Sequence, residues 1–125
     1  MEVHIAHPGG GPALVTMRGQ LDMDTAPALH AAFEELATRG LADVVVDLTE
    51  LDFCDSIGLS SFVVGHTRCV EQGGWLRLAA PNAFLIRLLS VVGVAEVVPM
   101  YATVEGACRD DRAELVGPWH DHLVA

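Results

Sequence analysis

The sequence is poor in basic residues. It contains no lysine, and its 7 arginines stand against 17 acidic residues, which gives a formal net charge of −10. Nucleic acids and anionic membrane surfaces attract clustered positive charge. The shortage of such charge argues against direct binding to either, so we expect neither nucleic acid nor membrane among the partners.

Long apolar runs and cysteine motifs are also missing. No stretch approaches the roughly 18 uninterrupted apolar residues of a membrane-spanning helix. The start, Met1–His4, lacks the basic and apolar parts of a secretion signal. The three cysteines, Cys54, Cys69 and Cys108, are widely spaced and form no CxxC pair. We expect reduced cysteines that serve as packing residues, in a cytoplasmic protein.

At 125 residues, of which 51% are hydrophobic, the chain is large enough for one domain whose core needs no disulfide or metal. We assign residues 1–115 to that domain and residues 116–125 to a C-terminal tail without hydrophobic periodicity. The tail holds His120-Asp121-His122, but adjacent residues on a flexible tail rarely complete a metal coordination sphere. The glycines at 9–11 match no nucleotide-binding pattern. We therefore expect no metal and no cofactor.

Hydrophobic periodicity predicts strands that alternate with helices. Strands are expected at Val3–Ala6, Ala13–Met17, Val44–Leu48, Trp75–Ala79 and Val94–Val98, and helices at Thr25–Thr38, Ser56–Glu71, Asn82–Gly93 and Thr103–Leu115. Residues 19–22 and 50–54 are interpreted as loops. A Gly/Pro-rich connection makes the first two strands an antiparallel hairpin, and the later strand-helix-strand order implies parallel neighbours. The sequence thus predicts one α/β domain with a mixed sheet and about four α-helices.

The third of these helices carries more apolar residues than a helix with one buried face needs. They are Phe84, Leu85, Ile86, Leu88, Leu89, Val91 and Val92. Either the helix is deeply covered, which is the commoner cause, or it offers an apolar patch to a partner.

The chain is organised around Val44–Leu48 and the segment Asp55–Leu59 that soon follows. The valine-rich run is typical of a strand covered on both faces. Asp55 suits a helix N-cap, because its carboxylate can accept hydrogen bonds from the first-turn amides. Ser56 then falls in the first turn, where backbone N–H groups and the helix dipole favour an anion such as phosphate. Capping alone would explain Asp55 without any partner.

Two motifs carry a family resemblance. Asp55-Ser56-Ile57-Gly58-Leu59, preceded by Asp47-Leu48 and Phe53, resembles the phosphorylation motif of bacterial anti-sigma factor antagonists, the prototype STAS domains. Gly19–Ala26 resembles the loop after that family's second strand, although Gln20 stands where many members carry Glu. This difference removes a charge beside the partner surface.

A weaker similarity in Leu88–Val94 and Thr103–Ala107 extends the resemblance over residues 3–110. It implies a STAS-like fold and a non-enzymatic regulator that binds an anti-sigma factor, itself a serine kinase, and so frees a sigma factor for transcription. The kinase would supply ATP and Mg²⁺, and phosphorylation of Ser56 would switch binding off. A phosphatase is a further expected partner, and the chain is expected as a monomer or weak dimer.

The resemblance also suggests a contact surface around Ser56. Asp22 and Asp55 match the family motifs, and adjacency adds the remaining candidates, Asp24, Thr25, Gly58, Leu59 and Ser60.

Two other interpretations remain. The domain could be a STAS scaffold, never phosphorylated, within a larger sensory or transport assembly. It could instead be an enzyme that uses Ser56 as a nucleophile, but the sequence has no Gly-x-Ser-x-Gly elbow and nothing assigns a His-Asp pair to this serine. Identification of the bound partner tests the first alternative, and a turnover screen tests the second.

Overall fold

The computed structural model describes residues 1–118 and contains one six-stranded sheet in the order β1-β2-β3-β4-β5-β6. The strands are β1 Glu2–Ala6, β2 Ala13–Leu21, β3 Asp43–Cys54, β4 Trp75–Ala79, β5 Met100–Tyr101 and β6 Leu115–Val116. The helices in this range are α1 Ala26–Thr38, α2 Ser56–Glu71, α3 Ala83–Val91, α4 Val94–Val97 and α5 Val104–Arg109. β1 and β2 are antiparallel, β2 to β5 run parallel, and β6 is antiparallel to β5. The expected mixed α/β fold is confirmed.

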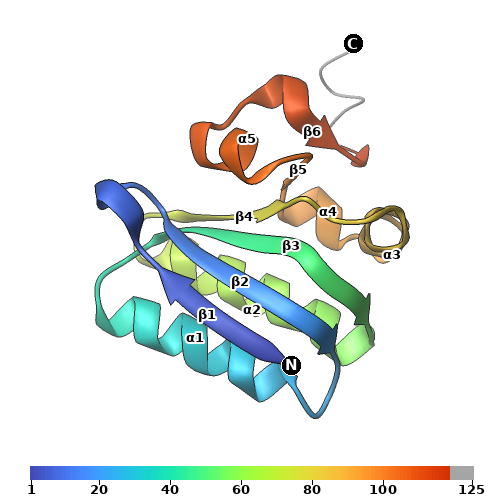
Figure 1. Cartoon of the computed structure of the whole chain (residues 1–125), viewed down its shortest axis with the longest axis horizontal. Helices are drawn as coiled ribbons and strands as arrows, with labels where there is room; N and C mark the ends of the chain where they lie inside the picture. Colours follow the sequence, from blue (N-terminus) through green and yellow to red (C-terminus); the bar gives the residue numbers. More distant parts are fainter. Residues whose placement is uncertain (119–125) are drawn as a thin grey trace.

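The sheet separates two apolar layers of unequal size. Figure 1 shows α1 and α2 along one face and α5 on the opposite side, next to β5 and β6. Alternate residues of the central strand divide between the layers: Val44 and Val46 join the large core under α1 and α2, whereas Val45 joins the small core under α5. This is why β3 reads as a continuous apolar run in the sequence.

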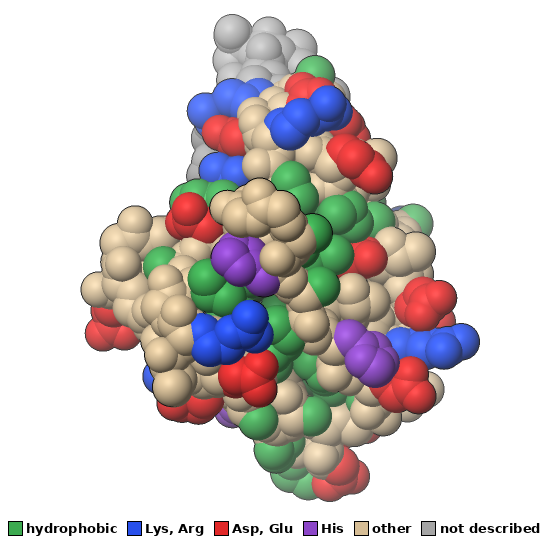
Figure 2. Space-filling model, turned by 60° about the vertical axis from the view of Figure 1, so that its left-hand side comes forward, with side chains coloured by type: hydrophobic (Ala, Val, Ile, Leu, Met, Phe, Trp, Pro, Cys, Tyr) green, Lys and Arg blue, Asp and Glu red, His purple; other side chains and the backbone are tan. Residues whose placement is uncertain are grey.

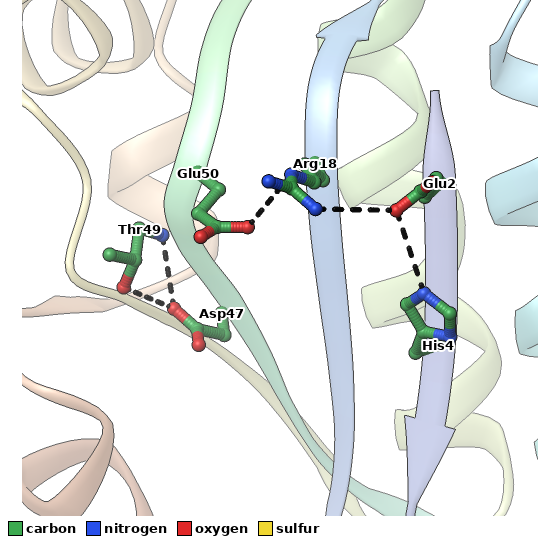
Figure 3. Close-up of polar contacts among 6 residues, drawn as sticks. All are labelled: Glu2, His4, Arg18, Asp47, Thr49 and Glu50. Carbon is green, nitrogen blue, oxygen red and sulfur yellow. Dashed lines mark hydrogen bonds and ion pairs between the residues drawn. The ribbon is translucent and has the colours of Figure 1, made fainter.

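The outer face of β1 to β3 is polar, as Figure 3 shows. Glu2 lies 3.8 Å from both Arg18 and His4, and Arg18 lies 3.3 Å from Glu50. The side chains in these ion pairs are more than half exposed, so each pair adds little to stability. The small core reaches this face at Val45 and the partly buried Leu14, and the ion-paired side chains stay open to solvent.

The first helix follows its sequence pattern closely. The buried side chains of α1 form the expected stripe of Ala26, Leu29, Ala32, Phe33 and Leu36. Its neighbour α2 approaches tightly, because a Cβ atom placed on Gly65 would lie 2.4 Å from the Phe33 ring. The glycine therefore allows the two helices to pack side by side against the same sheet face.

The expected loop at residues 50–54 is wrong, because β3 continues through it to Cys54. Residues 19–21, also interpreted as loop, belong to β2 and pair with this extension. Two register shifts interrupt the pairing, and they disturb the simple alternation that marks a strand. Leu51 and Cys54 are buried while Asp52 and Phe53 point to solvent, so the acidic residues lie on the exposed side of a strand.

The expected strand at Val94–Val98 is also wrong. Val94–Val97 forms the single-turn helix α4, and the strand β5 comes later, at Met100–Tyr101. Val94, Ala95 and Val98 are buried, which is the spacing of one helix face. Burial of this face outweighs the β preference of the valines, which is a weak one.

The expected closing helix, Thr103–Leu115, is shorter than predicted. α5 ends at Arg109, Asp110 takes a left-handed conformation with φ 53°, and a 3-10 turn at Arg112–Glu114 leads into β6. The expected domain boundary at residue 115 falls within β6. The tail motif His120-Asp121-His122 lies outside the described residues.

The apolar residues of the third helix are partly covered by the core and partly exposed, so both interpretations of this helix apply. Leu85 and Leu89 of α3 are fully buried, whereas Phe84 is 48%, Val92 51% and Val91 78% exposed. One face is therefore core, and the other is an apolar surface open to solvent. Among the helices of residues 1–118, none is long and apolar enough to cross a membrane.

Candidate partner-binding site at the start of helix α2

Asp55 caps α2 as predicted and also joins it to a second loop. One oxygen of its carboxylate accepts a hydrogen bond from the backbone N–H of Gly58 at 2.7 Å. The other accepts from the backbone N–H of Met23 at 3.2 Å. The two sequence motifs therefore lie against each other, and one carboxylate connects them.

Asp22 shapes the loop that Asp55 holds. Its Oδ1 accepts hydrogen bonds from the backbone N–H groups of Asp24 and Thr25, both at 3.0 Å. The Thr25 hydroxyl donates to the Gln20 carbonyl at 2.8 Å and accepts from the N–H of Asp22 at 2.8 Å. Asp22 and Thr25 thus fix the loop conformation, while Asp24 is exposed at its tip.

Gly58 is required by close packing beneath the site. A Cβ atom there would lie 2.6 Å from the Leu21 carbonyl oxygen and 3.0 Å from Cys54 Sγ. The Asp55 N–H also donates to the Leu21 carbonyl at 3.0 Å, which seats the start of α2 on the end of β2. Gly58 and Leu59 are both buried, so these two candidate contact residues support the site from within and contribute little surface.

The hydroxyl groups near the site differ in accessibility. Ser56 is exposed and is the first residue of the 16-residue helix α2. Ser60 donates to the Ile57 carbonyl at 2.7 Å, and Thr49 donates to Asp47 at 2.6 Å. Ser61 is fully buried and lies 2.9 Å from the His30 ring nitrogen. Ser56 thus combines solvent access with the anion-favouring first turn of a helix.

The nearby thiol is unsuited to nucleophilic chemistry. Cys54 and Cys69 are buried, which confirms their expected packing role. Burial, with a smaller contribution from the Asp55 charge, raises the pKa of Cys54 to about 12, so the thiolate is scarce near neutral pH. Within residues 1–118, no group of three or more His, Cys, Asp or Glu side chains could hold a metal ion.

Exposed apolar side chains surround Ser56, and sequence reasoning missed most of them. Met23 is 62% exposed and Ile57 46%, and the Phe53 ring stacks on Phe84 with 6.0 Å between centroids. A groove of about 410 Å³ opens beside the serine. Its lining comes from α2, from the residue after α3 and from the start of α4, namely Ser56, Leu59, Ser60, Val63, Val64, Val92 and Val94.

The surplus of apolar residues in the third helix was the one sequence signal for this groove. Single-helix periodicity cannot show that Val64 and Val92 line the same groove, because they belong to different elements. Acidic groups border the apolar area: Asp24 and Asp52 are exposed, and Asp22 and Asp55 are partly buried. The site is thus an apolar surface with an acidic edge and an accessible hydroxyl.

The mixed sheet, with α1 and α2 along one face and an exposed serine at the start of α2, defines a class of small α/β domains. Residues 8–99 match the family model described as "Mlab, STAS domain". The chain therefore belongs to the STAS domain family.

One relative by sequence and two solved structures illustrate the similarity. The "Anti-sigma-B factor antagonist" of Bacillus subtilis is 34% identical over 95 residues, which covers 76% of this chain and 86% of the relative. A crystal structure of an anti-sigma factor antagonist from Mycobacterium paratuberculosis superposes with a TM-score of 0.78 at 24% identity, over 87% of this chain and 92% of that one. The Bacillus cell fate determinant SpoIIAA in its phosphorylated form has the same fold, with a TM-score of 0.67 at 17% identity over 89% and 100% of the two chains.

Proposed function

We propose that this protein is an anti-sigma factor antagonist that binds an anti-sigma factor serine kinase in the cytoplasm and is switched off by phosphorylation of Ser56. The observation that carries the proposal is an exposed serine at the first position of α2, capped by Asp55 and bordered by an open apolar groove. The name of the 34% identical relative supports the partner class.

The surface beside Ser56 fits a protein partner. Exposed large apolar residues that gather on one surface are typical of interaction sites. Met23, Ile57 and Val92 are each about half exposed or more, and they flank the serine from three different segments. The acidic edge favours a partner whose apolar contact region carries basic groups around it. Of the candidate contact residues, Asp24 and Ser60 are exposed. Asp22 and Thr25 fix the loop before α1, and Asp55 joins that loop to α2.

This chain would contribute only the Ser56 hydroxyl to the phosphoryl transfer. The Ser56 Oγ would attack the γ-phosphorus of ATP held with Mg²⁺ by the kinase, lose its proton to the kinase's base, and release ADP. Ser60 and Thr49 already donate their hydroxyl hydrogens within the domain, and Ser61 is fully buried. These contacts support Ser56 as the acceptor. A phosphatase would reverse the modification by hydrolysis.

Phosphorylation would change the surface far more than the fold. A phosphoserine adds about −1.5 to −2 charges, and the positive end of the helix dipole offsets part of their local cost. The same charges would stand beside Asp55 and at the rim of the apolar groove. A partner that covers this area would have to desolvate them, so the affinity falls while the domain stays folded.

The chain itself is proposed to have no catalytic activity. His30, a potential base, is hydrogen-bonded to Ser61 and not to Ser56. The Cys54 thiol beneath the site has its pKa raised by burial to about 12. Neither group provides an activated nucleophile, and the kinase supplies the chemistry.

The test uses the full chain as bait in extracts of its native cell, followed by incubation of the recovered kinase with ATP and phosphopeptide mapping by mass spectrometry. We expect phosphate on Ser56, none in Ser56→Ala, and unchanged labelling in Ser60→Ala. Phosphate on Ser60 or Thr49 would reject the acceptor assignment. Recovery of a transport or sensory assembly without a kinase would favour the scaffold function instead.

A further inference from the structure

A second cavity lies at the other end of the sheet, where β4 begins. Its volume is about 210 Å³, and its polar lining comes from His66, Arg77, Tyr101, Asp110 and Arg112. β3 runs parallel to β4 and carries Ser56 just beyond its far end, so the cavity and Ser56 lie at opposite ends of the strands. The site defined around Ser56 therefore does not include it.

The cavity exists because β5 covers only part of β4. The β4–β5 pairing consists of Leu78 with Met100 and Ala79 with Tyr101. The start of β4, Trp75–Arg77, has no strand beside it on that edge within the described residues. The 3-10 turn and β6 contribute Arg112 and Leu115 to the lining of the cavity. Figure 1 shows β6 beside β5, on the α5 side of the sheet.

Arg77 is held rigidly in the wall of this cavity. Its guanidinium lies 3.5 Å from the centroid of the Trp75 ring and donates to the Ala107 carbonyl at 3.0 Å. A second nitrogen lies 3.9 Å from an Asp110 oxygen, and the side chain is 15% exposed. The Tyr101 hydroxyl donates a hydrogen bond to Asp110, so the Asp110 carboxylate contacts both Tyr101 and Arg77. The Asp110 backbone is left-handed, with φ 53°. A fixed, weakly hydrated guanidinium of this kind suits recognition of an oxyanion.

Two further groups line the cavity and have no hydrogen-bond or ion-pair partner within residues 1–118. Nδ1 of His66 is buried and has no hydrogen-bond partner within residues 1–118. Arg112 is exposed and lines the cavity together with Arg77. Two guanidinium groups and an imidazole thus face one carboxylate, in a chain whose net charge is −10. Figure 2 shows basic and acidic side chains intermixed at the top of the molecule.

We propose that the cavity binds a phosphate group, either free or carried by a small metabolite. A tetrahedral phosphate can accept from His66, Arg77 and Arg112 at once, whereas a planar carboxylate presents only two oxygens. The cavity has the volume of about seven waters, so it can hold a phosphate that carries a short carbon skeleton. Asp110 occupies one side of Arg77, so its carboxylate competes with the anion.

The test is an NMR titration of the full chain with sodium phosphate, at an ionic strength held constant with sodium chloride. We expect saturable shifts of backbone amides at His66, Arg77 and residues 110–112. Arg112→Gln should weaken binding roughly tenfold or more, since it removes a charged donor. Arg109→Gln is the matched control: it removes the same charge from an exposed arginine of the same segment that does not line the cavity.

The Asp110→Asn variant should change the phosphate affinity in the opposite direction. The variant keeps an acceptor for Tyr101 and tolerates the left-handed backbone, but it removes the competing charge, so phosphate should bind several-fold more tightly. Circular-dichroism melts verify that each variant is folded.

Shifts that rise linearly without saturation would overturn the proposal, as would equal losses in Arg112→Gln and Arg109→Gln. Acetate that binds as tightly as phosphate would also overturn it. A parallel titration with glycerol 3-phosphate distinguishes free phosphate from a phosphorylated metabolite as the ligand. Tighter binding than inorganic phosphate identifies a phosphorylated metabolite, and weaker binding identifies free phosphate.

Discussion

The two ends of the sheet use the same kinds of residues in opposite ways. Around Ser56, the carboxylates of Asp22 and Asp55 turn inward to backbone N–H groups, and large apolar side chains such as Met23 remain exposed. Around Arg77, charged and aromatic groups pair with one another, and Tyr101 is only 2% exposed. The first end leaves apolar surface to be covered by something else, while the second is largely closed by its own chain.

In both places an aspartate joins segments that are distant in the sequence. Asp55 ties the residue 22–25 loop to α2, and Asp110 ties the end of α5 to β4 and β5. The two ends of the sheet differ in the kind of surface that remains available for binding once these contacts have formed. Apolar area remains at the Ser56 end, which suits a protein partner, and polar hydrogen-bonding capacity remains at the Arg77 end, which suits a small anion.

The largest expected effect comes from Gly58→Ala, which disturbs the packing under the Ser56 end. The added methyl would meet the Leu21 carbonyl oxygen at 2.6 Å, and a backbone oxygen has little freedom to move. We expect a loss of about 3 kcal/mol in the free energy of unfolding, at the upper end for overpacking.

Urea unfolding measures this loss, and Gly11→Ala is the control. At Gly11 the nearest atom to an added Cβ lies 3.7 Å away, so its stability should change by less than about 1 kcal/mol. Equal stability of the Gly58→Ala variant and the wild type would contradict the packing argument.

Arg77→Met should produce the next largest effect, at the other end. It leaves the Ala107 carbonyl without its donor and Asp110 without its cation, while most of the apolar side-chain volume is kept. The expected loss is about 2 kcal/mol by thermal or urea unfolding. Arg18→Met removes an exposed ion-paired arginine and should cost less than about 1 kcal/mol. Similar losses in both variants would mean that Arg77 is no better held than a surface arginine.

The sequence predicted the Ser56 end better than the Arg77 end. The Asp55 cap depends on local residue order, and so does the α1 stripe, whose members lie one helical turn apart. The groove between Val64 and Val92 depends on how two helices meet, which no local pattern encodes. The surplus of apolar residues in α3 indicated only that an exposed apolar surface could exist there.

The region after residue 93 resisted prediction because local preference and tertiary burial disagree there. The valines of Val94–Val97 favour a strand in isolation, yet their burial spacing is helical. β5 and β6 are two-residue strands, too short for a recognisable alternation. The contact of Arg77 with Asp110 therefore could not be inferred, since it requires α5 to end early.

Val92→Ser tests whether the groove is a binding surface. Val92 is 51% exposed, so its loss should change stability by no more than about 0.5 kcal/mol. Affinity for the anti-sigma partner, measured by calorimetry, should fall roughly tenfold if this side chain is covered in the complex. Val70 is also 51% exposed but lies near the far end of α2, so Val70→Ser should bind like wild type. Equal affinity of both variants would exclude the groove from the interface.

The smallest expected effect concerns alkaline stability at the Arg77 end. Burial, with the Asp110 hydrogen bond as a further cause, raises the pKa of Tyr101 from 10.0 to about 12. The folded state therefore keeps the phenolic proton longer than the unfolded chain does. Stability from this group is complete below pH 10 and is lost as the pH rises toward 12, by about 0.4 kcal/mol at pH 10 itself.

The comparison of wild type with Tyr101→Phe isolates this contribution, since both share the titration of the buried cysteines. Unfolding curves between pH 8 and pH 11 should show a shallower decline for the variant. Parallel declines would indicate that Tyr101 titrates alike in the folded and unfolded states.

The central claim is that a phosphate on Ser56 blocks partner binding at the surface without unfolding the domain. The direct measurement is calorimetric titration of the anti-sigma partner with unmodified, enzymatically phosphorylated and Ser56→Ala protein, with circular-dichroism melts of each. We expect unmodified and Ser56→Ala protein to bind alike, and the phosphorylated form to bind roughly a hundredfold more weakly. Its melting temperature should shift by no more than a few degrees, which is about 1 kcal/mol or less. Equal affinity of the phosphorylated and unmodified forms, or loss of binding together with loss of the fold, would contradict the account.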